Sequence, residues 1–183
     1  MTIAQGAIVP DTEPDPRAAL TPAFLGSERD TLEGWLDVYR AAVFVKIAGL
    51  TADDLAQRSV PPSTMSPLGL VRHLTEVERY WLTDVALGED SPDLYSSRED
   101  PDGDFTLATA ARAQADVTAY RQEIETAREH VARIADLDAP VAGQRHGQPV
   151  NQRWIQVSRR NQRVDALRAA WRPLGQADDS VWL

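Results

Sequence analysis

The amino-acid sequence predicts an all-α fold, a four-helix bundle with one long crossing loop. Four stretches place apolar residues at steps of three and four, the spacing that gives a helix one apolar face. Residues 88–104 separate the second stretch from the third and show neither helical nor strand periodicity. Because four amphipathic helices can bury their apolar faces against one another, these observations together favour a bundle.

The first two long helices have clear boundaries in the sequence. We expect the first at residues 27–49, where Ser27 and Asp30 form a capping-box-like start, followed by a short helical turn at 51–55. The second spans residues 66–88, because Ser66 is a good N-cap, Pro67 suits the first helical position and Gly88 suits the end. Its predicted buried stripe consists of Leu70, Leu74, Val77, Trp81 and Val85.

The second half of the chain predicts two further helices. The third spans residues 107–136, with Leu107 on its buried side, and its His130 is expected at the surface or partly satisfied by a neighbour. Residues 141–150 hold two glycines and a proline around His146, which predicts a turn or a short irregular hairpin. Asn151 then caps a final helix that ends before Pro173. Its expected inward residues are Trp154, Val157, Asn161, Val164, Leu167 and Trp171, and Trp35 and Trp81 are also expected in the core.

Length, composition and charge restrict the class of protein. With 183 residues the chain fits one domain, which we divide into a flexible acidic and proline-rich leader (1–20), a helical bundle (21–175) and a C-terminal tail (176–183). The net charge of −9 argues against nucleic-acid and anionic-membrane partners. No apolar run approaches the roughly 20 residues that span a bilayer, and no signal peptide is evident, so we expect a cytoplasmic protein.

His73 is the histidine most suited by its position to a functional role. His73 lies on the flank of the second helix's apolar stripe, and Glu76 follows one turn later, so both side chains are able to face a groove between helices. For His73 the alternatives are a metal ligand or general acid/base, and a groove histidine bonded to a neighbour. For Glu76 the alternatives are a second oxygen ligand, an ion partner for Arg160 and Arg163 of the last predicted helix, and a helix-surface ion pair with Arg72 or Arg79.

The segments SERDTLEGWLDVYR, SPLGLVRHLTEVERYW and NQRW together resemble the actinobacterial mini-circle protein family of the DinB/YfiT-like helical bundles. The resemblance covers roughly residues 24–171. It implies a DinB-like four-helix fold, often dimeric, with a divalent metal held by three histidines, and kinship to thiol-dependent S-transferases and metal-dependent hydrolases. The first family histidine falls on His73, whereas the other two positions hold Arg160 and Arg163.

Arginine offers only hydrogen-bond donors and carries a positive charge, so Arg160 and Arg163 cannot replace histidine ligands. We therefore expect a degenerate metal site, with no cofactor, and zinc or nickel only if the family site survives. The main functional hypothesis is a binding or vestigial role, with a polar pocket that includes His73 and takes a small anionic or thiol ligand. The alternative is a divalent-metal-dependent thiol S-transferase or hydrolase, whose thiol would come from a cofactor because the chain has no cysteine. We expect a homodimer in either case.

Overall fold

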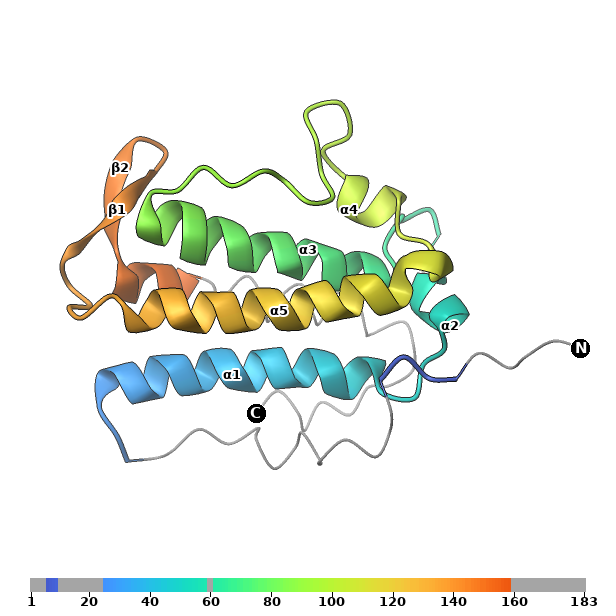
Figure 1. Cartoon of the computed structure of the whole chain (residues 1–183), viewed down its shortest axis with the longest axis horizontal. Coiled ribbons are helices and arrows are strands. Elements are labelled where there is room, and N and C mark those ends of the chain that lie inside the picture. The colour runs from blue at the N-terminus through green and yellow to red at the C-terminus, as the bar shows by residue number, and fades with distance from the viewer. Residues whose placement is uncertain (1–5, 10–24, 59–60, 159–183) are drawn as a thin grey trace, which may run out of the picture.

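The computed structural model describes residues 6–9, 25–58 and 61–158, and these residues are mostly helical (Figure 1). Three long helices lie side by side. They are α1 (Glu28–Ile47), α3 (Pro67–Arg79) and α5 (Ala113–Ala132), and α3 continues directly into a π-helical turn, η2 (Tyr80–Val85). The helix expected after Asn151 begins at residue 152 and is described as far as residue 158. The mainly helical fold is thus confirmed, and residues 159–172 of the predicted fourth helix lie outside the described residues.

Short elements occupy the two ends of the long helices. The helices α2 (Ala52–Ala56) and α4 (Gly103–Thr106) and the 3-10 turn η3 (Ala110–Arg112) lie at one end. At the other end, β1 (Pro140–Arg145) and β2 (Gln148–Asn151) pair as an antiparallel hairpin, which confirms the irregular hairpin expected there. The segment between η2 and α4 runs back along α3 as the expected crossing loop.

The predicted helix starts are confirmed by their hydrogen bonds. Ser27 and Asp30 form a reciprocal capping box, and the Ser66 hydroxyl accepts a hydrogen bond from the Gly69 backbone N–H at 3.0 Å. Asn151 caps the last helix, since its side-chain oxygen accepts from the backbone N–H of Trp154 at 2.9 Å. Gly88 has a φ of +72°, which ends the second helix where glycine is favoured.

The third long helix starts later than expected. The sequence predicts a start near residue 107, but α5 begins at Ala113, and Leu107 is exposed rather than buried. The reason is tertiary: residues 103–106 fold into α4 and pack against α3, so the chain enters α5 only after this contact is made.

Two apolar clusters hold the described elements together. The larger joins α1, α2, α3 and α5 through residues such as Val43, Leu74 and Tyr120, and the smaller joins η2 to α5 and the last helix through Trp81, Val131 and Ile155. Residues 6–9, which fall within the predicted leader, also pack on the first cluster. Val9 is buried, and its carbonyl accepts from the Gly49 backbone N–H at 3.0 Å, so this stretch is anchored to the bundle.

The buried face of the last helix differs from the predicted one. Trp154 and Val157 were expected to point inward, yet each is 44% exposed, while Ile155 is fully buried. The hairpin sets the rotation with which the chain enters this helix, and periodicity alone could not supply it. Trp35 is only partly buried, and Asn161, Val164, Leu167 and Trp171 lie outside the described residues.

Among the described residues, no helix is long and apolar enough to cross a membrane.

Candidate functional site

His73 meets an aspartate that the sequence analysis did not connect with it. His73 lies in the middle of α3, its side chain is 39% exposed, and its Nδ1 lies 2.8 Å from Oδ2 of Asp104 in α4. Asp104 is almost fully buried, and its other carboxylate oxygen accepts from the Phe105 backbone N–H at 2.9 Å. The Phe105 ring stacks on the imidazole with 5.3 Å between ring centroids. The histidine ring is therefore fixed in position and orientation.

The chemistry of this pair determines the tautomer. A carboxylate only accepts hydrogen bonds, so Nδ1 of His73 carries the hydrogen and donates it in a hydrogen bond to Oδ2 of Asp104. The lone pair then lies on Nε2, for which no described residue provides a hydrogen-bond partner. An imidazole oriented in this way is suited to accept a proton or to donate its lone pair to a metal ion.

Glu76 binds the crossing loop and does not pair with an arginine. Its Oε1 accepts from the backbone N–H groups of Leu94, Tyr95 and Ser96 at 3.1, 2.6 and 2.9 Å, and its Oε2 accepts from the Ser96 hydroxyl at 2.5 Å. Burial raises the pKa of Glu76, but the hydrogen bonds from Ser96, Tyr95 and Leu94 outweigh this, and the pKa is lowered overall. The carboxylate therefore fastens the crossing loop to α3, and the expected ion pair with Arg72 or Arg79 is not formed.

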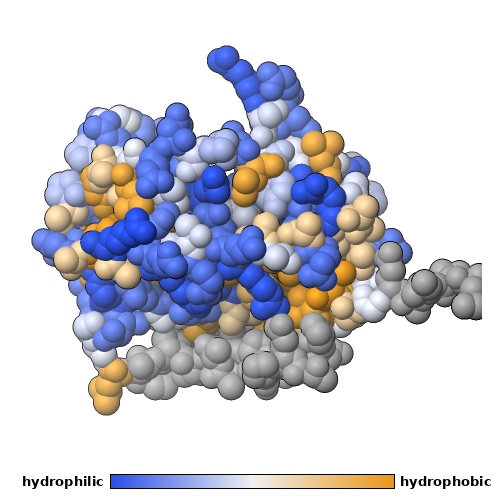
Figure 2. Space-filling model, viewed as in Figure 1, coloured by the Kyte–Doolittle hydropathy of each residue, from blue (hydrophilic) through white to orange (hydrophobic). Residues whose placement is uncertain are grey.

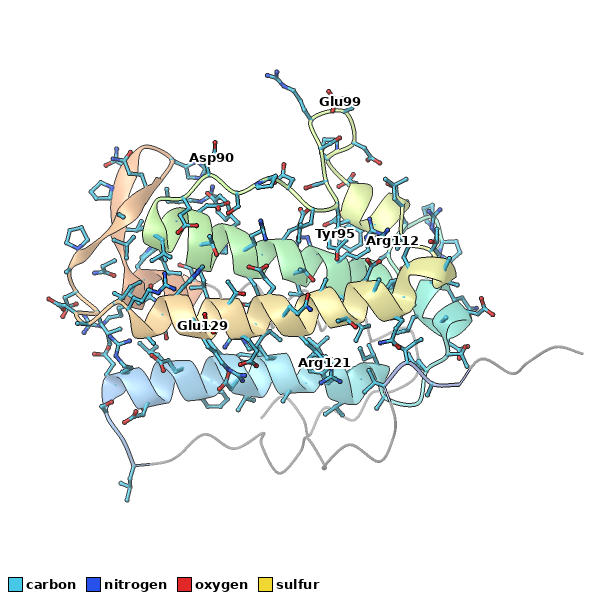
Figure 3. All side chains as sticks on the ribbon, in the orientation of Figure 1. Asp90, Tyr95, Glu99, Arg112, Arg121 and Glu129 are labelled. Atoms are coloured by element: carbon cyan, nitrogen blue, oxygen red, sulfur yellow. The ribbon has the colours of Figure 1, made fainter. Side chains whose placement is uncertain are left out.

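Arg72 connects the crossing loop, α4 and α5. Its guanidinium donates to the Gly103 carbonyl at 3.1 Å, pairs with buried Asp116 at 3.3 Å and lies over the Tyr95 ring at 4.2 Å. Figure 3 shows Tyr95 near the start of α5, where Arg112 also lies. Burial and the nearby Asp116 raise the pKa of the Tyr95 phenol to about 12, against an opposing effect of Arg72, so this group stays protonated. These contacts hold α4, and with it Asp104, against α3.

The other two histidines lie elsewhere. His130 was expected at the surface or partly satisfied, and the structure buries it: its Nδ1 lies 3.1 Å from the Leu82 carbonyl oxygen and 3.0 Å from the Thr83 hydroxyl. The π-helical turn η2 brings both of these residues toward α5, which periodicity could not reveal. His146 is exposed in the hairpin turn, as expected. Neither histidine joins His73.

One family of known proteins matches most of this chain. The family model of mycothiol S-transferase matches residues 31–161, which is most of the sequence. The chain belongs to the mycothiol S-transferase family. No curated protein and no solved structure gives a significant match. Mycothiol S-transferases are DinB-like and metal-dependent. The resemblance to DinB-like proteins is therefore confirmed, whereas membership of the mini-circle branch stays a prediction.

The metal-binding side chains described near His73 do not fit a three-ligand metal centre. No group of three histidine, aspartate or glutamate residues in the described part of this mycothiol S-transferase could hold a metal ion. Asp104 is engaged with Nδ1 of His73, and both oxygens of Glu76 are engaged with the crossing loop. The family positions assigned from the sequence, Arg160 and Arg163, lie outside the described residues and carry guanidinium groups.

Asp104 is a residue of the candidate site that the sequence analysis missed. It lies 31 residues after His73, in an acidic segment where several aspartates look equivalent. The only local signal is that Phe105 interrupts this polar segment with an aromatic ring, and that signal is weak.

Proposed function

We propose that the protein transfers a thiol to an electrophilic substrate and that His73 is the base that takes up the thiol proton. The observation that carries the proposal is the His73–Asp104 contact of 2.8 Å, which directs the imidazole lone pair away from the buried carboxylate. Membership of the mycothiol S-transferase family supports mycothiol as the thiol. Because the chain has no cysteine, the sulfur must come from such a co-substrate.

The proposed reaction has two proton transfers and one substitution. Nε2 of His73 accepts the proton of the thiol, and Asp104 stabilises the imidazolium that forms. The thiolate sulfur attacks the electrophilic carbon, so that a carbon–sulfur bond forms while the bond to the leaving group breaks. The leaving group departs with the bonding electron pair, and the imidazolium returns its proton to that group or to solvent. His73 acts here as a catalytic residue, and Asp104 as a positioning residue.

A non-catalytic binding role is the second candidate. The observation that favours it is the pair of arginines at the positions where the resemblance places metal-binding histidines. Two guanidinium groups with His73 would bind a thiolate or another small anion without turning it over. Binding of mycothiol without product formation would support this role over the transferase.

The test is a transfer assay with mycothiol and monochlorobimane on the full chain. His73→Ala should lower the rate by about 10²–10⁴-fold, the usual contribution of a general base. Added imidazole should restore part of the rate of this variant, because it supplies the missing base to the space left by the side chain. A merely structural role of His73 would not be rescued in this way.

Asp104→Asn tests the positioning role. It should lower kcat by about 10–100-fold, because an amide no longer fixes the tautomer that leaves the lone pair on Nε2. Asp102→Asn is the matched control, since Asp102 is exposed, lies two residues before Asp104 and makes no hydrogen bond to His73 through its side chain. Full transfer activity in His73→Ala without imidazole would overturn the proposed base.

A further inference from the structure

A pocket lies at the opposite end of α3 from Asp104, where the hairpin meets η2 and the last helix. A pocket of about 640 Å³ opens there, with Trp81, Arg145, Val150, Asn151 and Trp154 among its lining residues. This volume is typical of sites for small organic ligands. Trp81 follows His73 by eight residues, which is about 12 Å along a helix axis, so the pocket is separate from the His73 site.

Two indole rings form the apolar wall of this pocket. Trp81 is buried, whereas Trp154 is 44% exposed, and their ring centroids are 5.6 Å apart with an interplanar angle of 57°. Figure 2 shows hydrophobic surface at the end of the molecule where Figure 1 places the base of the hairpin. A half-exposed tryptophan beside a buried one offers a flat ring ligand a large contact area without any rearrangement of the core.

Arg145 provides a positive charge at the edge of the same wall. Its guanidinium carbon lies 5.3 Å from the centroid of the Trp81 ring and 5.5 Å from that of the Tyr80 ring, and Nη1 donates to the Tyr80 hydroxyl at 3.0 Å. Other arginines, such as Arg40 and Arg72, pair with carboxylates, but Arg145 has no carboxylate partner among the described residues. Its remaining N–H donors are therefore suited to a carboxylate that comes from outside.

The hairpin that carries Arg145 is held closely against η2. A Cβ atom on Gly143 would lie 2.4 Å from the carbonyl oxygen of Val85, so the two backbones touch where only glycine fits. The turn places His146 at a φ of +51°, an uncommon conformation for a residue other than glycine. The arginine is thus positioned before any ligand arrives, which reduces the entropy cost of binding.

We propose that this pocket binds a small aromatic carboxylate, with the ring against Trp154 and the acid group on Arg145. The ring accounts for the exposed indole, and the acid group accounts for the arginine that lacks a carboxylate partner in the described part of this acidic chain. The inference does not depend on the proposed thiol transfer, because it uses no residue of the His73 site.

The test is calorimetric titration of the full chain with 2-naphthoate and with its neutral isostere 2-naphthamide. Wild type should bind 2-naphthoate at least about tenfold more tightly than the amide, as expected for a hydrogen bond to a charged group. Arg145→Gln should remove this preference and leave the affinity for the amide unchanged. Trp154→Ala should weaken both ligands, and it is expected to fold because the ring is half-exposed.

Arg133→Gln is the matched control, since Arg133 is exposed and does not line the pocket. It should bind both ligands as wild type does. The proposal is overturned if wild type does not prefer 2-naphthoate, if Arg145→Gln keeps the preference while its circular dichroism is unchanged, or if Trp154→Ala binds both ligands normally.

Discussion

The substitution Glu76→Ala should open the crossing loop while the helices stay folded. The carboxylate accepts four hydrogen bonds from residues 94–96, at distances of 2.5–3.1 Å. A hydrogen bond to a charged group contributes about 1.5–3 kcal/mol. Because three of the four share one oxygen, we count two as fully effective and take the lower value, which gives about 3 kcal/mol for the closed loop.

Amide hydrogen exchange measures this local opening directly. A loss of about 3 kcal/mol corresponds to roughly 100-fold faster exchange of the Tyr95 and Ser96 amides, with little change in α3 and α5. Glu76→Gln keeps one oxygen acceptor, so it should cost less and accelerate exchange by about tenfold. Glu99→Ala removes an exposed carboxylate at the tip of the same loop (Figure 3) and serves as the control. Unchanged protection of the Tyr95 and Ser96 amides in Glu76→Ala would refute the reasoning.

The same loop should also open in acid. The pKa of Glu76 is lowered in the folded protein relative to its ordinary value of 4.5, so the folded state favours the carboxylate. Its contribution is therefore fully present above pH 4.5 and is lost as the pH falls through the lower folded-state pKa. In Glu76→Gln, exchange of the loop amides should lack this acid-dependent increase.

Four further predictions concern stability, metal binding and assembly. Arg40→Met should destabilise the fold by about 3–5 kcal/mol, because it removes the guanidinium that pairs with the buried Glu78 carboxylate at 3.0 Å. The double change Arg40→Met, Glu78→Leu should recover much of this loss in urea unfolding. Glu123 has a pKa raised by burial, so its charged form destabilises the fold as the pH rises above 4.5, and Glu123→Gln should flatten this dependence in thermal scans between pH 4 and pH 7. The double change Arg160→His, Arg163→His should gain zinc or nickel binding, and adding His73→Ala should remove it. Elemental analysis of wild type and the two variants measures this, and a tightly held metal in wild type would contradict the predicted loss of the metal site. Light scattering should give a dimer of the 20.2 kDa chain, and a monomer at high concentration would count against the expected association.

Local chemistry made several features of this chain predictable. Helices begin after Ser27, Ser66 and Asn151, as predicted. These starts were predictable because each side chain caps a backbone N–H only three residues later. The short hairpin likewise follows from the glycines and proline that surround its turn. These features require no information about distant parts of the chain.

Contacts between distant residues were not available from the sequence. The exposed face of Trp154 depends on how the hairpin turns the chain before the last helix, so apolar spacing alone gave the wrong inward face. The partners of Glu76 lie 18–20 residues away, and most are backbone N–H groups that every residue provides, which is why an ion pair was expected instead.

By itself the sequence determined a mainly helical chain with His73 on the flank of its second helix, since spacing and caps act over one or two turns. Only the tertiary structure decided what His73 can do. Asp104 reaches the imidazole because Arg72, Glu76 and the Phe105 ring hold the crossing loop and α4 against α3. That arrangement depends on packing between segments about thirty residues apart. Many acidic side chains of the crossing loop are equivalent in sequence, but among the described residues only Asp104 lies close enough to accept a hydrogen bond from the His73 ring.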